Sequence, residues 1–495
     1  MCGLVTENEI YLNRINEVKL NTLKHYVEKS GVGFGTSGAR GLVTALTEEI
    51  CVAYTSAFLK IVAKLFDFER VAIGVDLRPS SIDIAGSCAK AIQNMGYQVD
   101  FCGDVSTPTL ALYAQQKSMP AIMVTGSHIP FDRNGLKFYR PDGEITKADE
   151  LAMLAAEIEP LNDIDYLGLP SVNPDAVLAY EQRYLEFFPK DVLQGLNLGL
   201  YEHSSVARDS LKRILERLGA QVTSLGRTDI FVPIDTEAVS AEDVVRGQNW
   251  SRQYGFDSII STDGDGDRPL MSDEFGNWLR GDIVGLLTAR YLGAKNLAVP
   301  VSCNTAIELS GAFDQVVRTR IGSPYVIAAM QKLENETNDI AGFEANGGFL
   351  LGSKLIMNHR AISALPTRDC VLPILAVLAA SRQSENKISY LVRDIPQRYT
   401  ASDRIQEFST ETSRLFIGKW AKNPALFMAE VLDDYGLPVN QDETDGLRFT
   451  FANGLVIHLR PSGNAPELRC YCESSTAQEV ESVTQIVLLK IKELQ

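Results

Sequence analysis

A repeated unit of strand, helix and strand constrains the fold more than any other feature of this sequence. The stretch "RVAIGVDLRPSSIDIAGSCAKAIQNMGYQVDFCG" (70–103) holds an apolar strand, a polar loop, an amphipathic helix, Gly96 and a second strand. A looser copy, "LGLYEHSSVARDSLKRILERLGAQVTSLG" (198–226), repeats this order with Gly219, and a third such region is indicated over 296–333. A glycine that ends a helix before a strand is typical of parallel crossover units. The sequence therefore predicts an α/β fold with repeated crossovers.

The last hundred residues have a different pattern. "ETDGLRFTFANGLVIHLRPSGNAPELRCYCES" (443–474) is a series of strands joined by glycine-containing turns, and a helix over 477–494 follows it. This order predicts a separate antiparallel α+β domain. A chain of 495 residues also exceeds the roughly 250 to 300 residues at which one core stops growing. Proline, glycine and charge accumulate near 160–175, 273–282 and 392–403, where we expect linkers.

Bulk composition excludes several classes of protein. A net charge of -16 argues against a nucleic-acid binder. No apolar run reaches the roughly 18 residues of a membrane span, and the first twenty residues lack a signal-peptide pattern. The eight cysteines lack the spacing of a zinc site, so we expect mostly buried, reduced thiols in a cytoplasmic protein. Cys2 resembles an N-terminal cysteine nucleophile, but no downstream motif supports that interpretation.

The stretch "STDGDGDRPL" (261–270) concentrates three carboxylates, Asp263, Asp265 and Asp267, within five residues. Such carboxylates repel one another unless a cation lies among them, and hard oxygen ligands favour Mg²⁺ or Ca²⁺. An EF-hand calcium loop is one alternative, since Glu274 falls at its twelfth position, but Arg268 stands where that loop needs glycine. An acidic, solvated turn is another. The apolar "YGFDSII" predicts that this loop follows a strand.

Three further loops carry polar groups suited to chemistry. In "AIMVTGSHIPFDRNGLKFY" an apolar strand leads into Ser127 and His128, where the serine is a candidate nucleophile or a helix cap, and the histidine a candidate base or a structural residue. In "AGFEANGGFLLGS" Glu344 and Asn346 suit recognition of vicinal sugar hydroxyls, although a tight turn alone would use similar residues. The groups of "LRPSGNAPELR" that could surround a phosphate are Arg460, Ser462, Gly463 and Asn464.

The order of these loops resembles one family. "FGTSGARG", "TGSHIPFDRNGLK", "DGDGDR", "GFEANGG" and "RPSGNAP" together are similar to the α-D-phosphohexomutases, from about residue 33 to the end. The resemblance implies three similar α/β domains with mixed sheets and a C-terminal α+β domain, arranged around a central cleft. The corresponding ranges are 1–165 with a phosphoserine loop, 166–276 with a metal loop, 277–396 with a sugar loop, and 397–495 with a phosphate loop.

The resemblance also implies roles for single residues. Ser127 is expected to carry a phosphoryl group and, with Asp263, Asp265 and Asp267, to bind one Mg²⁺. Arg268 would stabilise the transferring group. Arg40 and Lys137 stand where the family has groups that assist proton transfer, and Lys137 is the better candidate because arginine is a poor base; His128 completes the catalytic set. The implied substrate contacts are Glu344 and Asn346 to sugar hydroxyls, and Arg460, Ser462, Gly463 and Asn464 to the distal phosphate.

The expected reaction interconverts hexose 6-phosphate and hexose 1-phosphate through a hexose 1,6-bisphosphate, which also serves as activator. Mannose phosphates are the first expectation; glucose and glucosamine phosphates are alternatives, as is a catalytically silent sugar-phosphate-binding relative. The expected protein is an isomerase of carbohydrate metabolism, a monomer or a dimer, without nucleic-acid or membrane partners. Several residues depart from the family pattern: Gly126, Ile129, Asn346, Gly348 and Asn464. None of them removes the nucleophile.

Overall fold

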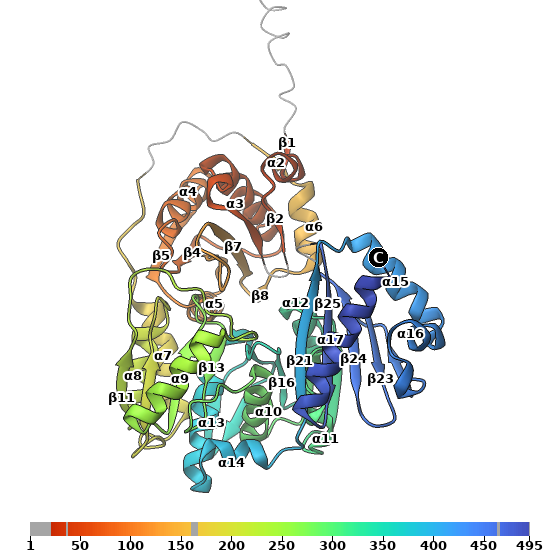
Figure 1. Ribbon diagram of the computed structural model, residues 1–495. Coiled ribbons are helices and arrows are strands. Elements are labelled where there is room, and N and C mark those ends of the chain that lie inside the picture. Colours follow the sequence, from red (N-terminus) through yellow and green to blue (C-terminus); the bar gives the residue numbers. More distant parts are fainter. Residues whose placement is uncertain (1–20, 36–37, 160–166, 463–465, 495) are drawn as a thin grey trace, which may run out of the picture.

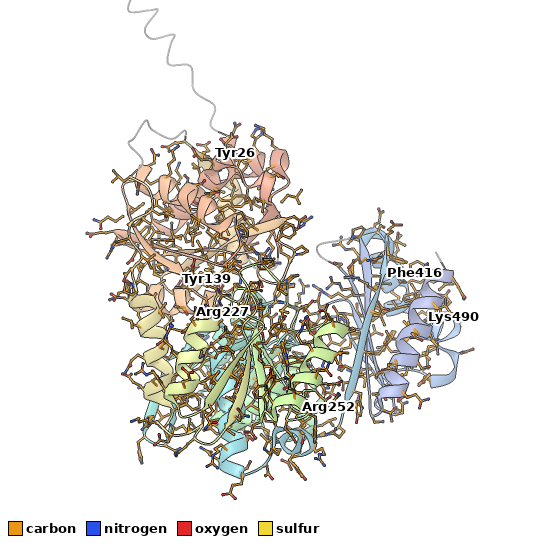
Figure 2. All side chains as sticks on the ribbon, turned by 60° about the vertical axis from the view of Figure 1, so that its left-hand side comes forward. Tyr26, Tyr139, Arg227, Arg252, Phe416 and Lys490 are labelled. Atoms are coloured by element: carbon orange, nitrogen blue, oxygen red, sulfur yellow. The ribbon has the colours of Figure 1, made fainter. Side chains whose placement is uncertain are left out.

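The computed structural model describes residues 21–35, 38–159, 167–462 and 466–494. Figure 1 shows an N-terminal part in red and orange, a central part from yellow to cyan, and a C-terminal part in blue that stands to one side. Tyr139, labelled in Figure 2, lies where the N-terminal part meets the centre, and Phe416 and Lys490 mark the C-terminal part. Cys2 lies outside the described residues.

The N-terminal sheet is mixed, with the strand order β2-β3-β7-β6-β4-β5 and with β8 paired to β7. Its first predicted crossover is confirmed, because β4 and β5 pair in parallel on either side of α4. Gly96, after α4, has φ 84°, the left-handed conformation that ends a helix. The strands are β2 (Gly33–Phe34), β3 (Ala39–Leu42), β4 (Arg70–Val75), β5 (Gln98–Asp104), β6 (Ala121–Val124), β7 (Arg133–Arg140) and β8 (Gly143–Glu144), and β1 (Asn21–Thr22) pairs β9 (Glu157–Ile158). The helices are α2 (Leu23–Ser30), η1 (Val43–Ala45), α3 (Glu48–Val62), α4 (Ser81–Asn94), α5 (Thr107–Gln116) and α6 (Lys147–Ala155).

Two further sheets repeat part of this order. The second sheet runs β11-β10-β12-β13 and the third β15-β14-β16-β17-β20, each with a parallel crossover and an antiparallel return strand. The second unit comprises α7 (Asp175–Phe187), β10 (Asn197–Tyr201), α8 (Arg208–Arg217), β11 (Gln221–Leu225), α9 (Ala241–Tyr254), β12 (Ser258–Thr262) and β13 (Pro269–Met271). The third comprises α10 (Gly281–Leu292), β14 (Asn296–Pro300), α11 (Ala306–Leu309), β15 (Gln315–Thr319), α12 (Ser323–Glu334), β16 (Ile340–Phe343), β17 (Phe349–Leu351), β18 (Leu355–Met357), β19 (Arg360–Ile362), β20 (Leu365–Asp369), α13 (Val371–Ser384) and α14 (Ile388–Arg393).

The three sheets therefore share one equivalent loop. It leaves the carboxyl end of β6, β12 or β16 and returns as the antiparallel strand β7, β13 or β17. These three positions hold the serine loop with Ser127, the acid loop with Asp263, Asp265 and Asp267, and the sugar loop with Glu344 and Asn346. Ligands of α/β sheets bind where parallel strands end, so the repeated topology brings three different chemistries to corresponding places.

The predicted C-terminal α+β domain is confirmed. Its antiparallel sheet has the order β21-β25-β24-β23-β22 and encloses a core of its own that includes Trp420 and Phe427. The elements are β21 (Tyr399–Gln406), α15 (Thr410–Lys422), α16 (Pro424–Val431), η2 (Asp433–Tyr435), β22 (Asn440–Asp442), β23 (Leu447–Thr450), β24 (Val456–Pro461), β25 (Glu467–Ser474) and α17 (Ala477–Glu493).

A polar cluster attaches this sheet to the third unit. Glu473 accepts hydrogen bonds from Arg398 Nε at 2.6 Å and from the Thr305 backbone N–H at 3.0 Å, and Asn304 Nδ2 donates to the Arg398 carbonyl at 2.9 Å. The second and third units share one hydrophobic core, which joins Leu198 and Leu211 to Leu297 and Leu375. The exact domain boundaries stay a prediction.

Seven cysteines lie in the described part of the chain, and all are buried free thiols, as the sequence predicts: Cys51, Cys88, Cys102, Cys303, Cys370, Cys470 and Cys472. Within that part, no helix combines the length and the apolar character needed to cross a bilayer.

Candidate active site

Ser127 lies in a strained turn directly after β6. Its φ of 53° is left-handed, which a non-glycine residue adopts at an energetic cost unless its surroundings hold it. The Thr125 hydroxyl accepts a hydrogen bond from the Ser127 backbone N–H at 2.8 Å, and Ser127 Oγ donates to Asp263 Oδ2 at 2.8 Å. No helix begins at Ser127, so the helix-cap alternative is wrong. The fixed hydroxyl faces the acid loop of another unit.

Arg78, which the sequence analysis did not single out, holds the serine loop. All five guanidinium N–H donors are used: one on Asp76, and four on the carbonyl oxygens of Ser127, Ile129, Pro130 and Arg133. The guanidinium also explains a departure from the family pattern, because a Cβ at position 126 would lie 2.5 Å from Arg78 Cζ. Glycine is therefore the residue that leaves room for this clamp.

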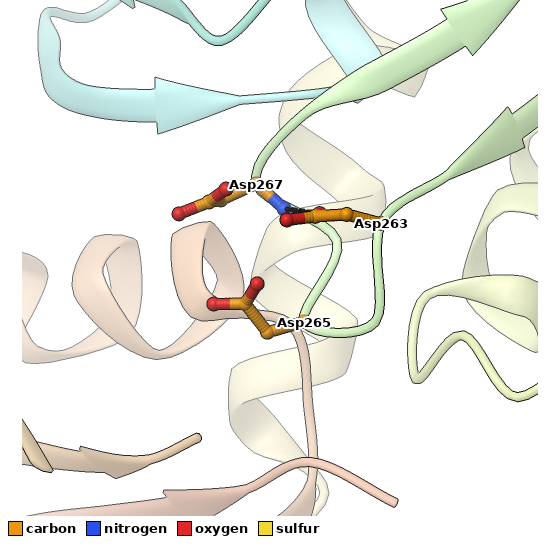
Figure 3. Close-up of side chains that lie close together, drawn as sticks. All are labelled: Asp263, Asp265 and Asp267. Carbon is orange, nitrogen blue, oxygen red and sulfur yellow. Dashed lines mark hydrogen bonds between the residues drawn. The ribbon is translucent and has the colours of Figure 1, made fainter. Parts of the chain in front are cut away.

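The acid loop follows β12, as predicted, and its three carboxylates lie close together. Figure 3 shows Asp263, Asp265 and Asp267 on the loop between β12 and β13, with one oxygen of each within 4.8 Å of the others. All three are fully buried, so the solvated-turn alternative is wrong. The EF-hand alternative is also wrong, because Glu274 accepts hydrogen bonds from Ser389 instead.

The carboxylates fit a divalent cation. Among the described residues, Asp265 Oδ1 and Asp267 Oδ1 are buried oxygens without a hydrogen-bond partner. Their Oδ2 atoms are engaged: Lys137 Nζ donates to both, at 2.6 and 2.7 Å, and the Thr107 hydroxyl donates to Asp265 Oδ2 at 2.5 Å. Each of these two acids thus keeps one oxygen for a ligand, and buried anionic oxygens are the donors that hard divalent ions prefer.

Burial and mutual repulsion act differently on the three acids. Burial, then the charges of Asp265 and Asp267, raise the pKa of Asp263 well above its usual value. Burial also raises the pKa of Asp265, but the Lys137 ammonium and hydrogen bonds from Lys137 and Thr107 outweigh burial and lower it. For Asp267 the pKa is likewise lowered, because the charge of Arg368 leads the effects that oppose burial. Lys137 and Arg368 thus favour the ionised forms of Asp265 and Asp267, the forms in which a carboxylate binds a cation.

The other predicted catalytic residues surround the triad. Arg268 Nε lies 3.7 Å from Asp263 Oδ2 and 3.5 Å from Asp267 Oδ1. Burial and the charges of Arg268 and Arg368 lower the pKa of Arg40 to about 10. His128 Nδ1 lies 3.4 Å from Ser127 Oγ, and burial and Arg268 lower the pKa of His128 to about 3, so its imidazole is neutral.

The sugar loop is well ordered by its own hydrogen bonds. Glu344 follows β16 and is almost fully buried, and its N–H donates to the Gly348 carbonyl at 3.2 Å. The Asn346 side-chain oxygen accepts from the Gly348 N–H at 3.0 Å, and the Asn346 carbonyl accepts from Thr236 of the second unit at 2.7 Å. The loop therefore presents Glu344 from a fixed backbone.

Arg368 joins the sugar loop to the acid loop, and sequence reasoning missed it. It lies on β20, with Nη2 2.9 Å from Asp267 Oδ2 and Nη1 donating to Glu344 Oε2 at 3.2 Å. A lone arginine in "LPTRD" has no local signature. Its contacts arise only because β20 pairs with β17, the return strand of the sugar loop.

Arg460 and Ser462, two of the predicted phosphate-binding residues, make contacts within the C-terminal domain. Arg460 lies on β24 and its Nε is 2.8 Å from Asp445 Oδ2, within the C-terminal domain. The Ser462 N–H donates to the Glu467 carbonyl at 2.8 Å. Gly463 and Asn464 lie outside the described residues. The roles of all four residues stay predictions.

His458, near this loop, gives a prediction for acid stability. The ring is buried and its Nε2 is 2.5 Å from the Asp445 carbonyl; burial lowers the pKa of His458 from 6.5 to about 4. Between these values the unfolded chain binds a proton that the folded chain does not, so folding stability falls as the pH falls from 6.5 towards 4. The loss amounts to about 3 kcal/mol.

Calorimetric unfolding temperatures measured from pH 7 to pH 4 test this expectation. His458→Gln keeps an N–H donor but cannot take up a proton, so its unfolding temperature should fall less steeply with decreasing pH. His25→Gln, on an exposed helix position, is the control and should retain the original slope. Equal slopes for the unaltered chain and His458→Gln would contradict the assignment.

Comparison with known proteins agrees with the topology. Family models described as phosphoglucomutase/phosphomannomutase match here: alpha/beta/alpha domain I at residues 31–162, alpha/beta/alpha domain III at 280–399 and the C-terminal domain at 403–490. A phosphomannomutase of Salmonella muenchen is 49% identical over 94% of this chain and 97% of its own. A phosphomannomutase of Sinorhizobium fredii is 43% identical over 91% and 97%.

Solved structures show the same fold at low identity. The crystal structure of a putative phosphomannomutase from Thermus thermophilus has a TM-score of 0.72 at 18% identity, over 94% of this chain and 98% of that one. Aspergillus fumigatus N-acetylphosphoglucosamine mutase, in complex with GlcNAc-6P and magnesium, has a TM-score of 0.57 at 14% identity, over 96% and 99%.

Fold, site and relatives together define an enzyme that moves a phosphoryl group within a sugar phosphate. The chain belongs to the phosphoglucomutase/phosphomannomutase family, the α-D-phosphohexomutases. Within that family it is an isomerase of the phosphomannomutase type that acts on hexose phosphates.

Proposed function

We propose that the enzyme interconverts mannose 6-phosphate and mannose 1-phosphate through a phosphoserine at Ser127. The observation that carries the proposal is the 2.8 Å hydrogen bond from Ser127 Oγ to Asp263, which joins the strained serine to the buried acid triad. In the first half-reaction the bond between phosphorus and Ser127 Oγ breaks and a bond to a sugar hydroxyl oxygen forms. The second half-reaction returns the other phosphate of the hexose 1,6-bisphosphate to Ser127.

The proposed cofactor is one Mg²⁺ held by Asp263, Asp265, Asp267 and an oxygen of the phosphoserine. The two buried carboxylate oxygens without a hydrogen-bond partner, Asp265 Oδ1 and Asp267 Oδ1, support this ligand set. Bound there, Mg²⁺ would polarise the transferring phosphoryl group. Arg268 lies beside two of these acids and can stabilise the charge of the phosphoryl oxygens.

Proton transfer has two candidate residues in this site. Lys137 is the better candidate from the family resemblance, and its hydrogen bonds to Asp265 and Asp267 hold it beside the acid triad. His128 lies 3.4 Å from Ser127 Oγ, but with a pKa of about 3 its imidazole is a weak base, so it is the weaker of the two candidates. Arg40, with its lowered pKa, keeps its charge near neutral pH and can support the phosphoryl oxygens.

The preference for mannose rests on the relatives. Phosphomannomutases are 49% and 43% identical over more than nine-tenths of this chain, whereas a phosphoglucosamine mutase of Citrifermentans bemidjiense is 28% identical over 72%. Glu344 and Asn346 are proposed to bind the sugar hydroxyls, and Arg460, Ser462, Gly463 and Asn464 the distal phosphate.

A coupled assay with Mg²⁺ and catalytic hexose 1,6-bisphosphate tests the substrate. We expect kcat/KM for mannose 1-phosphate to exceed that for glucose 1-phosphate and glucosamine 1-phosphate by about tenfold, the effect of one hydrogen bond with a net value of about 1.4 kcal/mol. A preference for glucose 1-phosphate would replace mannose as the substrate but retain the mechanism. A full rate from dephosphorylated enzyme without bisphosphate would contradict the phosphoserine cycle.

A further inference from the structure

Arg368 makes two charged contacts that cross between functional loops. Its Nε donates to Asp267 Oδ2 at 3.1 Å and its Nη2 lies 2.9 Å from the same oxygen, while Nη1 donates to Glu344 Oε2 at 3.2 Å. The exposed fractions of the side chains of Arg368, Asp267 and Glu344 are 4%, 0% and 5%. Buried guanidinium contacts of this kind fix the orientation of a carboxylate as well as neutralising its charge. The donors of the planar guanidinium form good hydrogen bonds with only a narrow range of carboxylate positions.

Asp267 and Glu344 belong to different units. Asp267 ends the acid loop before β13, and Glu344 opens the sugar loop after β16. The Asp267 oxygen that Arg368 contacts is Oδ2, so the contact does not use Oδ1, which has no hydrogen-bond partner and lies 3.5 Å from Arg268 Nε. Arg368 therefore orients a carboxylate of the acid triad without using the oxygen that a metal ion would need.

The side chain of Arg368 occupies the space where a side chain of residue 348 would lie. A Cβ at position 348 would lie 2.6 Å from Arg368 Cδ, 2.7 Å from Cγ and 3.0 Å from Cβ. Those distances are too short for carbon atoms, so any other residue at 348 would displace the arginine. Gly348 and Arg368 thus form one structural pair, although twenty residues separate them in the sequence.

Neighbouring residues hold β20 on both sides of Arg368. The Thr367 hydroxyl donates to Glu144 Oε1 of the N-terminal unit at 2.6 Å, and Asp369 accepts hydrogen bonds from Tyr180 and Tyr184 of α7 at 2.6 and 2.5 Å. Three consecutive residues of one strand therefore contact all three α/β units. The backbone beneath Arg368 is fixed from several directions.

We propose that Arg368 is a positioning residue of the mutase. It fixes the position of Asp267 of the acid loop relative to Glu344 of the sugar loop, and Gly348 provides the space for the arginine side chain. This inference rests on the proposed function for the roles of the two acids. It assigns to one guanidinium both the orientation of a metal ligand and the orientation of the sugar-binding carboxylate.

Arg368→Lys tests the proposal because it keeps the charge and removes the planar fork. We expect the dissociation constants of Mg²⁺ and of mannose 1-phosphate, each measured by calorimetric titration of the full chain, to rise about tenfold. Wild-type affinity for both ligands in Arg368→Lys would overturn the proposal, because a positive charge alone would then suffice. Since Mg²⁺ binding is measured without turnover, this result is distinct from failure of the mutase assay on the unaltered enzyme.

Arg183→Lys is the matched control. Arg183 is also a buried arginine, but its guanidinium donates to Ser363 at 2.8 and 2.7 Å and contacts neither acid. The control should keep both affinities within about twofold. If Arg183→Lys lost as much affinity for Mg²⁺ and mannose 1-phosphate as Arg368→Lys, the effect at Arg368 would be explained by general destabilisation. That result would overturn the proposal.

Gly348→Ala provides a second test that leaves Arg368 in the chain. The added methyl group should displace the arginine and raise the same two dissociation constants. An Arg368→Ala background removes the two shortest contacts, with Cδ and Cγ, and leaves only the 3.0 Å contact with Cβ, so the further change should be smaller than in the unaltered chain. Additive effects of Gly348→Ala and Arg368→Ala would contradict the pairing, and this cycle also decides the case if Arg368→Lys does not fold.

Discussion

The Ser127→Ala enzyme is expected to interconvert hexose phosphates at least about 10³-fold more slowly than the unaltered enzyme, because it lacks the oxygen that carries the phosphoryl group. The fold should survive: the Ser127 backbone is held by Thr125 and Arg78, and neither contact uses the hydroxyl. The measurement is the coupled assay with bisphosphate, together with the intact mass of enzyme exposed to bisphosphate. Only the unaltered enzyme should gain the mass of one phosphate.

Ser210→Ala is the matched control for this substitution. Ser210 lies on α8, and its Oγ is buried without a hydrogen-bond partner in the described structure. Loss of that hydroxyl should leave turnover and phosphate incorporation unchanged. Turnover by Ser127→Ala at more than about a tenth of the normal rate would sink the covalent mechanism.

Asp265→Asn is expected to weaken Mg²⁺ binding by about 100-fold, more than the loss of an outer hydrogen-bond partner. The substitution removes a negative charge from the triad and leaves the Lys137 ammonium facing an amide instead of a carboxylate. At a fixed low concentration of Mg²⁺ the rate should fall in proportion, and higher Mg²⁺ should restore part of it. Titration with Mg²⁺, followed by both heat and rate, gives the two constants.

Asp229→Asn controls for the loss of one acidic group. Asp229 is almost fully exposed and pairs with Arg208 outside the triad. It should bind Mg²⁺ with the original affinity. An unchanged titration for Asp265→Asn would remove that residue from the ligand set and would leave the other two acids to be tested in turn.

The sequence predicted those parts of the site that depend on short, local patterns. The acid loop is recognisable because three carboxylates fall within five residues, and the serine loop because an apolar strand leads directly into polar residues. The crossover units are equally local, since each joins neighbouring segments, and the parallel pairing of β4 with β5 and of β10 with β11 follows from them.

Residues whose role depends on distant contacts could not be predicted. Arg78, Thr107 and Arg368 stand in sequences without a distinctive pattern, and each acts on a loop from another part of the chain. Likewise, Gly126 and Gly348 were seen only as departures from the family pattern. Their reason is steric: in each case an arginine from elsewhere fills the space of the missing side chain.

The Arg78 clamp has a consequence for the order of events in the proposed cycle. One guanidinium binds the Ser127 carbonyl and three neighbouring carbonyls. The serine therefore cannot move from one end of a bound sugar to the other. The bisphosphate must therefore turn end over end while the nucleophile stays still. Such a rotation needs space around the bound sugar, and contacts to the sugar that are weak and can be exchanged. The rate of rotation, relative to the rate of release into solvent, determines how often the cycle loses its intermediate.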